Sequence, residues 1–176
     1  QSVGGVVAIA EQSVVSGCSV GGTLTGSSET EFDGYASSIV GGVAGRATDS
    51  KIENCKMEGR IIAKTLAGGI AGYANNTAIT DCTLASSAEI DAESHFIGGI
   101  AGRARYCSTV RRCTVEGTVS TLSGNYVGGV VGHLTSGSAC DCSVTRNASI
   151  SSRGNHTGGI VGALQANETL ASDNGN

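Results

Sequence analysis

Aliphatic and small residues recur along this chain with a period of about 30 residues. Six Gly-Gly pairs mark the period. They begin at residues 4, 41, 68, 98, 128 and 158, so successive pairs are 37, 27, 30, 30 and 30 residues apart. The second residue after the first glycine of each pair is Val or Ile in every case. Markers that return at a fixed period indicate a tandem repeat, which restricts the fold before any local propensity is considered.

Between the Gly-Gly pairs, aliphatic residues alternate with Ser, Thr, Asn and charged residues. One apolar column stands three residues before a recurrent cysteine: Val15, Ile52, Ile79, Val110 and Ala139. Another follows that cysteine by two residues: Val20, Met57, Leu84, Val115 and Val144. Short alternations of this kind predict strands, about three in each unit, and no stretch keeps a helical period for three turns.

A unit of about 30 residues with short strands cannot bury its apolar side alone, whereas stacked units share a continuous core. The sequence therefore predicts an all-β fold, a parallel β-solenoid (β-helix) of about five coils. Each column would become a ladder of like residues about 4.8 Å apart. A β-propeller would need longer blades with aromatic signatures, but aromatic residues make up only 3% of this chain. The crossover rule favours a right-handed coil, although it does not fix the hand of a solenoid.

The glycines divide the chain into residues 3–38, 39–65, 66–95, 96–125 and 126–155, with a partial unit at 156–176. We expect residues 1–176 to form one solenoid domain. Neither end offers a polar capping unit, which predicts a piece of a longer array or, alternatively, ends that pair head to tail. The first unit is longest, and its extra residues between Gly26 and Ser38 predict a protruding loop.

The Gly-Gly pairs interrupt the strand alternation. Val40 and Val43 are both apolar but three residues apart, so a flat strand would direct them to opposite faces. We therefore expect a bend at the glycines. The column just before each pair is bulky: Ile39, Leu66, Phe96, Tyr126 and His156. Beside a bend, this column is predicted to be partly exposed and to form a contact surface.

Five of the seven cysteines share one column: Cys18, Cys55, Cys82, Cys113 and Cys142. Flanking aliphatic columns of the same parity predict that they form an inward-facing structural ladder of free thiols. Cys107 and Cys140 break the column and lie in successive units, so a disulfide between them is an open alternative. These cysteines lack the CxxC pairs typical of zinc sites, and no metal or cofactor site is expected.

The residue five positions after the first glycine varies among Arg46, Tyr73, Arg103 and His133. Such a ladder is either a contact strip for a glycan or an acidic partner, or a solvated outer face. Glu58 and Glu116 share another column with one coil between them, a separation that could suit an inverting glycosidase. No second acidic column supports catalysis, so no catalytic residues are assigned.

Charge restricts the partners of this chain. The net charge is −4 and the pI about 5.3, whereas nucleic-acid binding calls for a basic stripe. No apolar segment is long enough to predict membrane insertion. Asp81, Arg112 and Asp141 occupy one column and would alternate in sign along the side of the solenoid. Such a ladder favours a structural role for these charges.

A four-residue block, GVAG, GIAG, GIAG, GVVG and GIVG, recurs at residues 42–45, 69–72, 99–102, 129–132 and 159–162. Followed by segments such as Ile52-Glu53-Asn54-Cys55 and then Gly59, it resembles the GLUG-type repeat of bacterial surface proteins. Ile or Val stands here where that motif has Leu. The resemblance implies a secreted or cell-wall protein, adhesin-like or accompanying an immunoglobulin A peptidase, in which the repeats form stalks or binding modules rather than the catalytic part.

Three hypotheses follow. The first is a non-enzymatic extracellular β-solenoid segment, structural or adhesive, of a bacterial surface protein, with a host glycan or host protein as partner. The second is a filament subunit whose partner is another copy of itself, stacked head to tail through uncapped ends. The third is a carbohydrate-active enzyme built on a β-helix, which would require a cleft between carboxylates.

Overall fold

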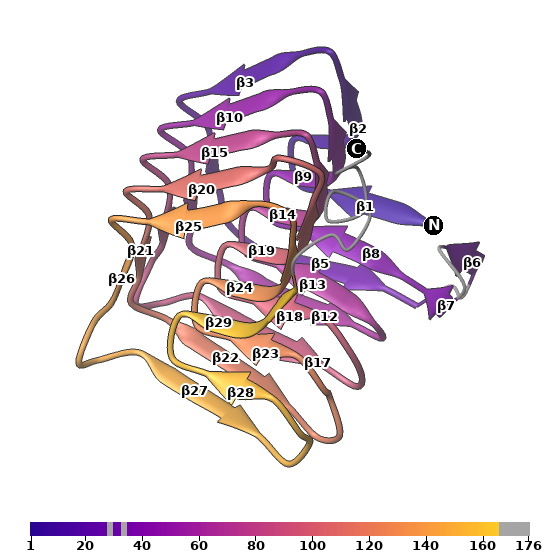
Figure 1. Cartoon of the computed structure of the whole chain (residues 1–176), viewed down its shortest axis with the longest axis vertical. Coiled ribbons are helices and arrows are strands. Elements are labelled where there is room, and N and C mark those ends of the chain that lie inside the picture. Colours follow the sequence, from indigo (N-terminus) through magenta and orange to yellow (C-terminus); the bar gives the residue numbers. More distant parts are fainter. Residues whose placement is uncertain (28–29, 33–34, 166–176) are drawn as a thin grey trace, which may run out of the picture.

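The computed structural model describes residues 1–27, 30–32 and 35–165 of the chain. The described residues form strands and turns without a helix, and the strands stack as successive coils of one parallel β-solenoid (Figure 1). About 30 residues make one coil. The predicted all-β parallel solenoid is confirmed. Each coil has five short strands, however, rather than the three expected, because additional corners divide the apolar runs.

Strand bounds follow the repeat. The first coil contains β1 (Ser2–Gly4), β2 (Val7–Glu11), β3 (Val14–Ser16), β4 (Ser19–Val20) and β5 (Thr23–Gly26). The second contains β8 (Ile39–Gly41), β9 (Ala44–Thr48), β10 (Lys51–Glu53), β11 (Lys56–Met57) and β12 (Arg60–Ala63). The third contains β13 (Leu66–Gly68), β14 (Ala71–Asn75), β15 (Ala78–Thr80), β16 (Thr83–Leu84) and β17 (Glu89–Ala92).

The later coils keep the same order. The fourth contains β18 (Ile97–Gly98), β19 (Ala101–Arg105), β20 (Thr109–Arg111), β21 (Thr114–Val115) and β22 (Thr118–Thr121). The fifth contains β23 (Val127–Gly128), β24 (Val131–Thr135), β25 (Ser138–Cys140), β26 (Ser143–Val144) and β27 (Ser149–Ser152). A sixth, partial coil contains β28 (Thr157–Gly158) and β29 (Val161–Gln165).

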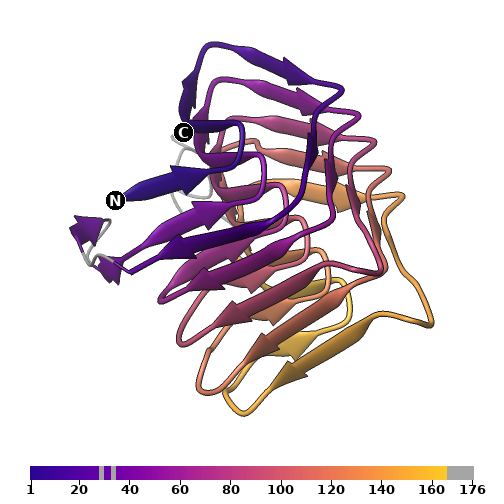
Figure 2. The ribbon, with the colours of Figure 1, turned by 180° about the vertical axis from the view of Figure 1, so that it is seen from behind.

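Like strands of successive coils pair in parallel and form five sheets that run along the solenoid. Sheet A is β1-β8-β13-β18-β23-β28 and sheet B is β2-β9-β14-β19-β24-β29. Sheets C, D and E have five strands each, in the orders β25-β20-β15-β10-β3, β26-β21-β16-β11-β4 and β27-β22-β17-β12-β5. Figure 2 shows the same stack from behind, with the coils following one another from indigo to yellow.

The register between coils matches the columns of the sequence. Ile52 pairs with Val15 on one side and with Ile79 on the other, and Met57 pairs with Val20 and Leu84. These aliphatic ladders fill the interior, where the side chains of Ile52, Met57 and Ile79 are fully buried. The repeat therefore sets both the strand register and the core.

The Gly-Gly pairs form the corner between sheets A and B, as predicted. β8 ends at Gly41 and β9 begins at Ala44, so the chain turns at this point and both Val40 and Val43 enter the core with 0% exposure. Backbone packs against backbone at this corner. A Cβ atom on Gly42 would lie 2.0 Å from the carbonyl oxygen of Gly69 in the next coil, so no side chain fits there.

The long first unit protrudes as predicted. Its insertion forms an antiparallel hairpin of β6 (Thr30–Phe32) and β7 (Tyr35–Ser37), which projects from the side of the solenoid in Figure 1. Separately, the described residues contain no helix with the length and hydropathy of a membrane span.

Candidate binding groove

One long edge of the solenoid carries the segments that join sheet E to sheet A. We call this row the loop edge, and it comprises residues 64–65, 93–96, 122–126 and 153–156 together with the β6–β7 insertion of the first coil. The joining segments lengthen after the second coil. They therefore rise beyond the end of sheet E and form one wall of a groove that runs across several coils.

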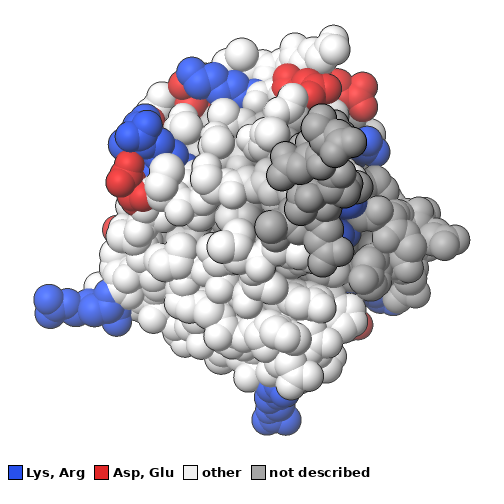
Figure 3. Space-filling model, viewed as in Figure 1, with Lys and Arg blue, Asp and Glu red and all other residues white. Residues whose placement is uncertain are grey.

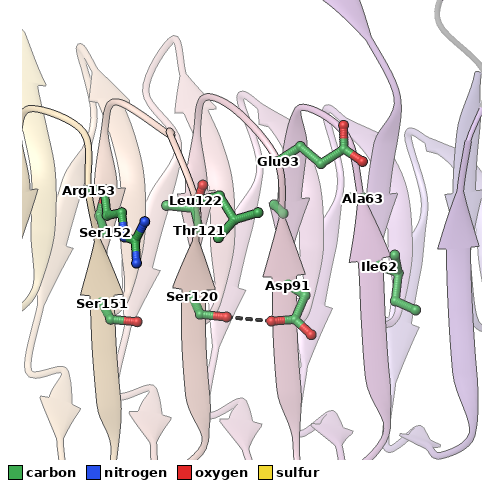
Figure 4. A pocket seen from close by; sticks show the side chains of 11 residues that line it. Ile62, Ala63, Asp91, Glu93, Ser120, Thr121, Leu122, Ser151, Ser152 and Arg153 are labelled. Atoms are coloured by element: carbon green, nitrogen blue, oxygen red, sulfur yellow. Dashed lines mark hydrogen bonds between the residues drawn. The ribbon is translucent and has the colours of Figure 1, made fainter.

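The groove lies on the outer side of sheet E and has a volume of about 420 Å³ (Figure 4). Eleven residues from four successive coils line it: Ile62, Ala63, Asp91, Ala92, Glu93, Ser120, Thr121, Leu122, Ser151, Ser152 and Arg153. Aliphatic and hydroxyl side chains predominate. An apolar cleft with a few placed polar groups is typical of a binding site.

The floor is a ladder of outward-facing residues on neighbouring strands. Ile62 pairs in register with Asp91, Asp91 with Ser120, and Ser120 with Ser151. The Ser120 hydroxyl donates a hydrogen bond to Asp91 Oδ1, and Arg60 forms an ion pair with Asp91 Oδ2. The hydrogen bond from Ser120, followed by that from Arg60, holds the pKa of the Asp91 carboxyl below its usual range. Asp91 is therefore an ionised carboxylate whose charge is already compensated.

The rim carries Glu93, Leu122 and Arg153, one from each of three successive joining segments (Figure 4). All three are exposed, and Leu122 has 72% of its surface accessible. Within the described part of the chain, neither Glu93 nor Arg153 takes part in an ion pair. The groove thus has an uncompensated anion toward one end, an uncompensated cation toward the other, and an apolar side chain between them.

The predicted contact strip is present as a ladder, since Arg46, Tyr73, Arg103 and His133 pair in register. Only part of it is open to solvent, because Arg46 and Arg103 are half-buried whereas the other two residues are buried. Tyr73 and His133 are only 4% and 7% exposed, and the Arg103 guanidinium lies 4.9 Å from the centre of the Phe96 ring. Burial, followed by the charge of Arg103, lowers the pKa of His133.

Tyr73 and His133 are buried because they pack against the bulky column before the Gly-Gly pairs. Ile39, Leu66 and Phe96 are each 2% exposed, so the expectation of a partly exposed column was wrong for these three. The bend at the glycines turns them toward sheet B instead of toward solvent. Only Tyr126, which is half-buried, and His156, which is exposed, fit that expectation.

Aromatic rings continue this column along the axis. The Phe96 and Tyr126 rings stack with centres 5.2 Å apart, and those of Tyr126 and His156 with centres 5.0 Å apart. All three residues have a left-handed backbone, with φ of 62°, 63° and 61°. Bulky residues rarely adopt this conformation, so ring stacking helps to compensate its cost.

The cysteine column lies inside the solenoid. Cys55, Cys82 and Cys113 are buried, and Cys18 and Cys142 in the outer coils are half-buried. Each thiol contacts the carbonyl oxygen two residues earlier, as Cys82 Sγ does with Thr80 at 3.2 Å. All five are free thiols.

Cys107 and Cys140 are exposed and are also free thiols in this structure. The Cys107 N–H donates to the Ser136 carbonyl, whereas Cys140 pairs in register with Arg111. The one-residue insertion in the fourth coil falls at Cys107 and offsets it from Cys140, so the structure does not bring the two together. No cluster of three metal-ligating side chains occurs among the described residues.

The carboxylates considered for catalysis lie outside the groove. Glu58 accepts a hydrogen bond from Lys56 Nζ at 2.6 Å and another from Ser19 Oγ at 3.1 Å. The first of these, followed by the second, lowers the pKa of Glu58. Glu58 and Glu116 project from the same side of sheet D, so they do not face each other across a cleft as glycosidase carboxylates do.

The alternating charge ladder is present in modified form. Arg112 pairs with Asp81, but Asp141 pairs with Arg111, whose Nε lies 3.0 Å from Asp141 Oδ2. On the face in Figure 3, charged side chains lie near the margins and a broad uncharged area separates them. The described residues on that face form no continuous patch of one sign.

Sequence reasoning did not identify the groove. Its lining residues are spaced by the coil length, and they vary between Ile, Asp and Ser, so no conserved-looking motif marks them. The one signal available was the lengthening of the units after the second coil, which indicates raised segments beyond sheet E.

Comparison of the sequence with models of known protein families finds one family that matches. The model of the GLUG motif matches residues 36–62 and 96–120. The first match covers the bulky residue, the Gly-Gly corner, the cysteine turn and part of β12, and the second covers the same features in the fourth coil. No curated protein and no solved structure matches the chain.

Proposed function

From the premise that this chain is a GLUG-motif repeat protein, we propose that it is a non-enzymatic, extracellular segment of a larger bacterial surface protein. The solenoid serves as its structural body, and the loop edge with its groove makes adhesive contacts. The GLUG repeats and the β-solenoid fold fit a repeat segment of a larger protein. The resemblance to repeats of bacterial surface proteins supports the extracellular position.

One observation carries the structural role: core columns are open at both ends of the stack. In the second and third coils, Ile52, Cys55 and Ile79 are at most 1% exposed. The equivalent Val15 and Ala139, in the first and fifth coils, are only partly buried. Large apolar side chains whose equivalents in inner coils are buried are also exposed on the outer coils: Val6, Ile160 and Leu164.

Open apolar ends of this kind are costly in water, since buried apolar surface contributes about 25 cal/mol per Å². A further coil or domain on either end would bury these side chains and continue the backbone ladders. The solenoid therefore suits a repeat segment of a larger protein.

The non-enzymatic character is supported by the arrangement of the acidic residues. Asp81, Asp91, Glu53 and Glu58 each form an ion pair with a neighbouring Lys or Arg. The pairs of Asp81 and Asp91 join neighbouring coils and stabilise their register, and none of the four pairs forms the two-sided arrangement that glycoside cleavage requires.

Surface labelling tests the extracellular position. Antibodies raised against residues 39–158 should bind intact cells of the source bacterium, and protease added to intact cells should remove the signal. Labelling that appears only after the cells are permeabilised would contradict the proposal. An antibody against a cytoplasmic protein is the matched control for cell integrity.

A filament of stacked copies is the second candidate, and the same open ends favour it. Negative-stain electron microscopy with light scattering over a concentration series distinguishes the two candidates: uniform fibres support the filament, and discrete particles support the segment.

A further inference from the structure

We propose that the groove binds an extended peptide in the polyproline II conformation that carries one cationic and one anionic side chain three residues apart. The cation pairs with Glu93 and the anion with Arg153. This inference deepens the adhesive part of the proposed function and rests on it.

The first support is charge. Asp91 is neutralised by Arg60, whose Nε lies 3.2 Å from Asp91 Oδ2, and by the hydroxyl of Ser120. Glu93 and Arg153 are exposed, line the groove, and form no ion pair with other described residues. The groove therefore offers one anion and one cation to a ligand, and a ligand of mixed charge satisfies both.

The second support is spacing. Ala92 pairs with Thr121, and Thr121 with Ser152, so the following residues Glu93 and Arg153 stand two coils apart. At about 4.8 Å for each coil, two coils correspond to about 9.6 Å along the axis.

A polyproline II peptide fits this spacing. It has three residues per turn and rises about 3.1 Å per residue, so side chains i and i+3 lie on one side about 9.3 Å apart. In a β-strand, same-side residues are about 6.6 Å (i, i+2) or 13 Å (i, i+4) apart, and neither distance fits.

The third support is the surface between the two charges. Leu122 is 72% exposed on the rim and Ile62 is 39% exposed at one end, so apolar atoms of a peptide would cover both. The hydroxyls of Ser120 and Ser151 lie on the floor below (Figure 4). A polyproline II backbone has no internal hydrogen bonds, and one of its carbonyl groups can accept a hydrogen bond from the Ser151 hydroxyl, whereas the Ser120 hydroxyl already donates to Asp91.

Other ligand classes fit less well. A neutral glycan would leave both rim charges without a partner, and the groove lining contains no aromatic ring on which a sugar could stack. A polyanion such as nucleic acid would meet Arg153 but also Glu93 and Asp91, as well as a net charge of −4 on the whole chain. A peptide of mixed charge avoids both penalties.

The test uses the whole chain and two fluorescent peptides of equal composition, measured by anisotropy at low salt. One contains Lys-Pro-Pro-Glu, and the other is its isomer Lys-Pro-Glu-Pro, which places the charges two residues apart. We expect the first to bind up to about fivefold more tightly, because only that peptide forms both surface ion pairs. Equal binding of the two isomers would overturn the predicted spacing.

Charge reversal makes the test specific. Glu93→Lys should lose the preference for Lys-Pro-Pro-Glu and prefer Glu-Pro-Pro-Glu, whereas Arg153→Glu should prefer Lys-Pro-Pro-Lys. Matched control variants with the same change of net charge are Glu11→Lys and Arg146→Glu, which lie outside the groove and are exposed. They should behave as the parent chain does. If the controls change preference equally, net charge alone explains binding and the proposal fails.

Circular dichroism of every variant establishes that the fold is retained, and the exposure of both rim residues favours this. Binding of neutral or anionic oligosaccharides that is lost in the groove variants, without peptide binding, would assign the groove to glycans and overturn the inference. Absence of peptide binding together with positive labelling of intact cells would refute this inference alone, while labelling only after permeabilisation would refute the proposed function.

Discussion

Arg112 in the fourth coil donates two hydrogen bonds to Asp81 in the third, from Nε to Oδ1 and from Nη2 to Oδ2, and both are 2.7 Å long. The two residues occupy the same corner in successive coils, immediately before the cysteine column. Both have a left-handed backbone, with φ of 51° and 56°. Arg is an uncommon residue in this conformation, and its bidentate pair with a carboxylate in the neighbouring coil compensates for the placement.

The Arg112–Asp81 pair makes stability depend on pH in the acidic range. The hydrogen bond from Arg112 lowers the pKa of Asp81 in the folded state below its value in the unfolded chain. The contribution of the pair is therefore present above the unfolded pKa, near 4, and is lost as pH falls through the folded pKa. Asp81→Asn should flatten the decline in urea-unfolding stability between about pH 5 and pH 2.

Salt provides the control for this pair. Both side chains are substantially exposed, at 48% for Arg112 and 38% for Asp81, so added salt should reduce the difference between the parent chain and Asp81→Asn. A pH dependence that is identical in the two proteins at low salt would show that the pair contributes nothing to stability.

Thiol reactivity should divide the cysteines into two groups. Cys107 and Cys140 are exposed, whereas Cys82 is 0% exposed, and burial raises the pKa of Cys55. Because the thiolate is the reactive form, iodoacetamide should label Cys107 and Cys140 first in the folded protein. Cys55, Cys82 and Cys113 should react only after unfolding in guanidinium. Peptide mass spectrometry over a time course measures the order, and early labelling of Cys82 would contradict the buried ladder.

The period and the columns were sufficient to predict the solenoid, the bend at the Gly-Gly pairs and the inward cysteine ladder. Each of these follows from a local rule that every coil obeys, because Val40 and Val43 can share a core only if the chain turns between them. The number of strands in each coil did not follow. Except at Gly17, the corners before the cysteines are made by non-glycine residues such as Asn54 in the left-handed conformation, and the column analysis did not assign them as breaks.

Burial of the outer columns could not be predicted for a related reason. Whether Phe96 is exposed depends on what stands opposite it, and the opposing residues, Arg103 and His133, belong to another sheet. The groove likewise depends on how far the segment containing Leu122 rises above sheet E. Column analysis compares the same position in successive coils, so it cannot detect contacts between different columns.

A ladder of hydroxyl side chains, which includes Ser50 and Thr77, lies at the corner between sheets B and C. Its hydrogen bonds provide a test of packing at this corner. The Thr77 hydroxyl donates to the Asn75 carbonyl at 2.8 Å and accepts from the Ser50 N–H at 3.4 Å, and Thr77 is 1% exposed. Thr77→Val keeps the shape but removes the acceptor for Ser50, and should lower the unfolding free energy by about 1–3 kcal/mol. Thr83→Val, at an outward position of β16, is the matched control and should change stability little. Equal stability of the two variants would contradict the role of the ladder.

The second glycine of each pair, except Gly159 in the last coil, should tolerate no side chain. A Cβ on Gly69 would lie 2.2 Å from the Gly99 carbonyl oxygen and 2.7 Å from Leu84 Cδ1, so Gly69→Ala must displace backbone. We expect Gly69→Ala to lower the free energy of unfolding by about 1–3 kcal/mol, the range observed when a packed core is overfilled. At Gly21 a Cβ would meet nothing within 4 Å, so Gly21→Ala should be close to neutral in the same urea-unfolding measurement. A neutral Gly69→Ala would mean that the coils at this corner lie farther apart.

His133 should make stability fall as the solution becomes mildly acidic. Its ring lies 5.1 Å from the Tyr126 ring and 5.5 Å from the Phe96 ring, and burial together with Arg103 lowers its folded-state pKa. The unfolded chain therefore binds a proton at a higher pH than the folded chain does. The contribution of neutral His133 to stability is complete above the unfolded pKa, about 6.5, and decreases as pH falls through that value toward the folded pKa.

His133→Phe keeps a ring in the cluster but cannot titrate, so its stability should vary less between about pH 7.5 and pH 5. Measurement at pH 8, where the parent histidine is neutral, gives the packing effect of the substitution alone. A parent chain and variant with parallel pH profiles would show that His133 is protonated equally in the folded and unfolded states.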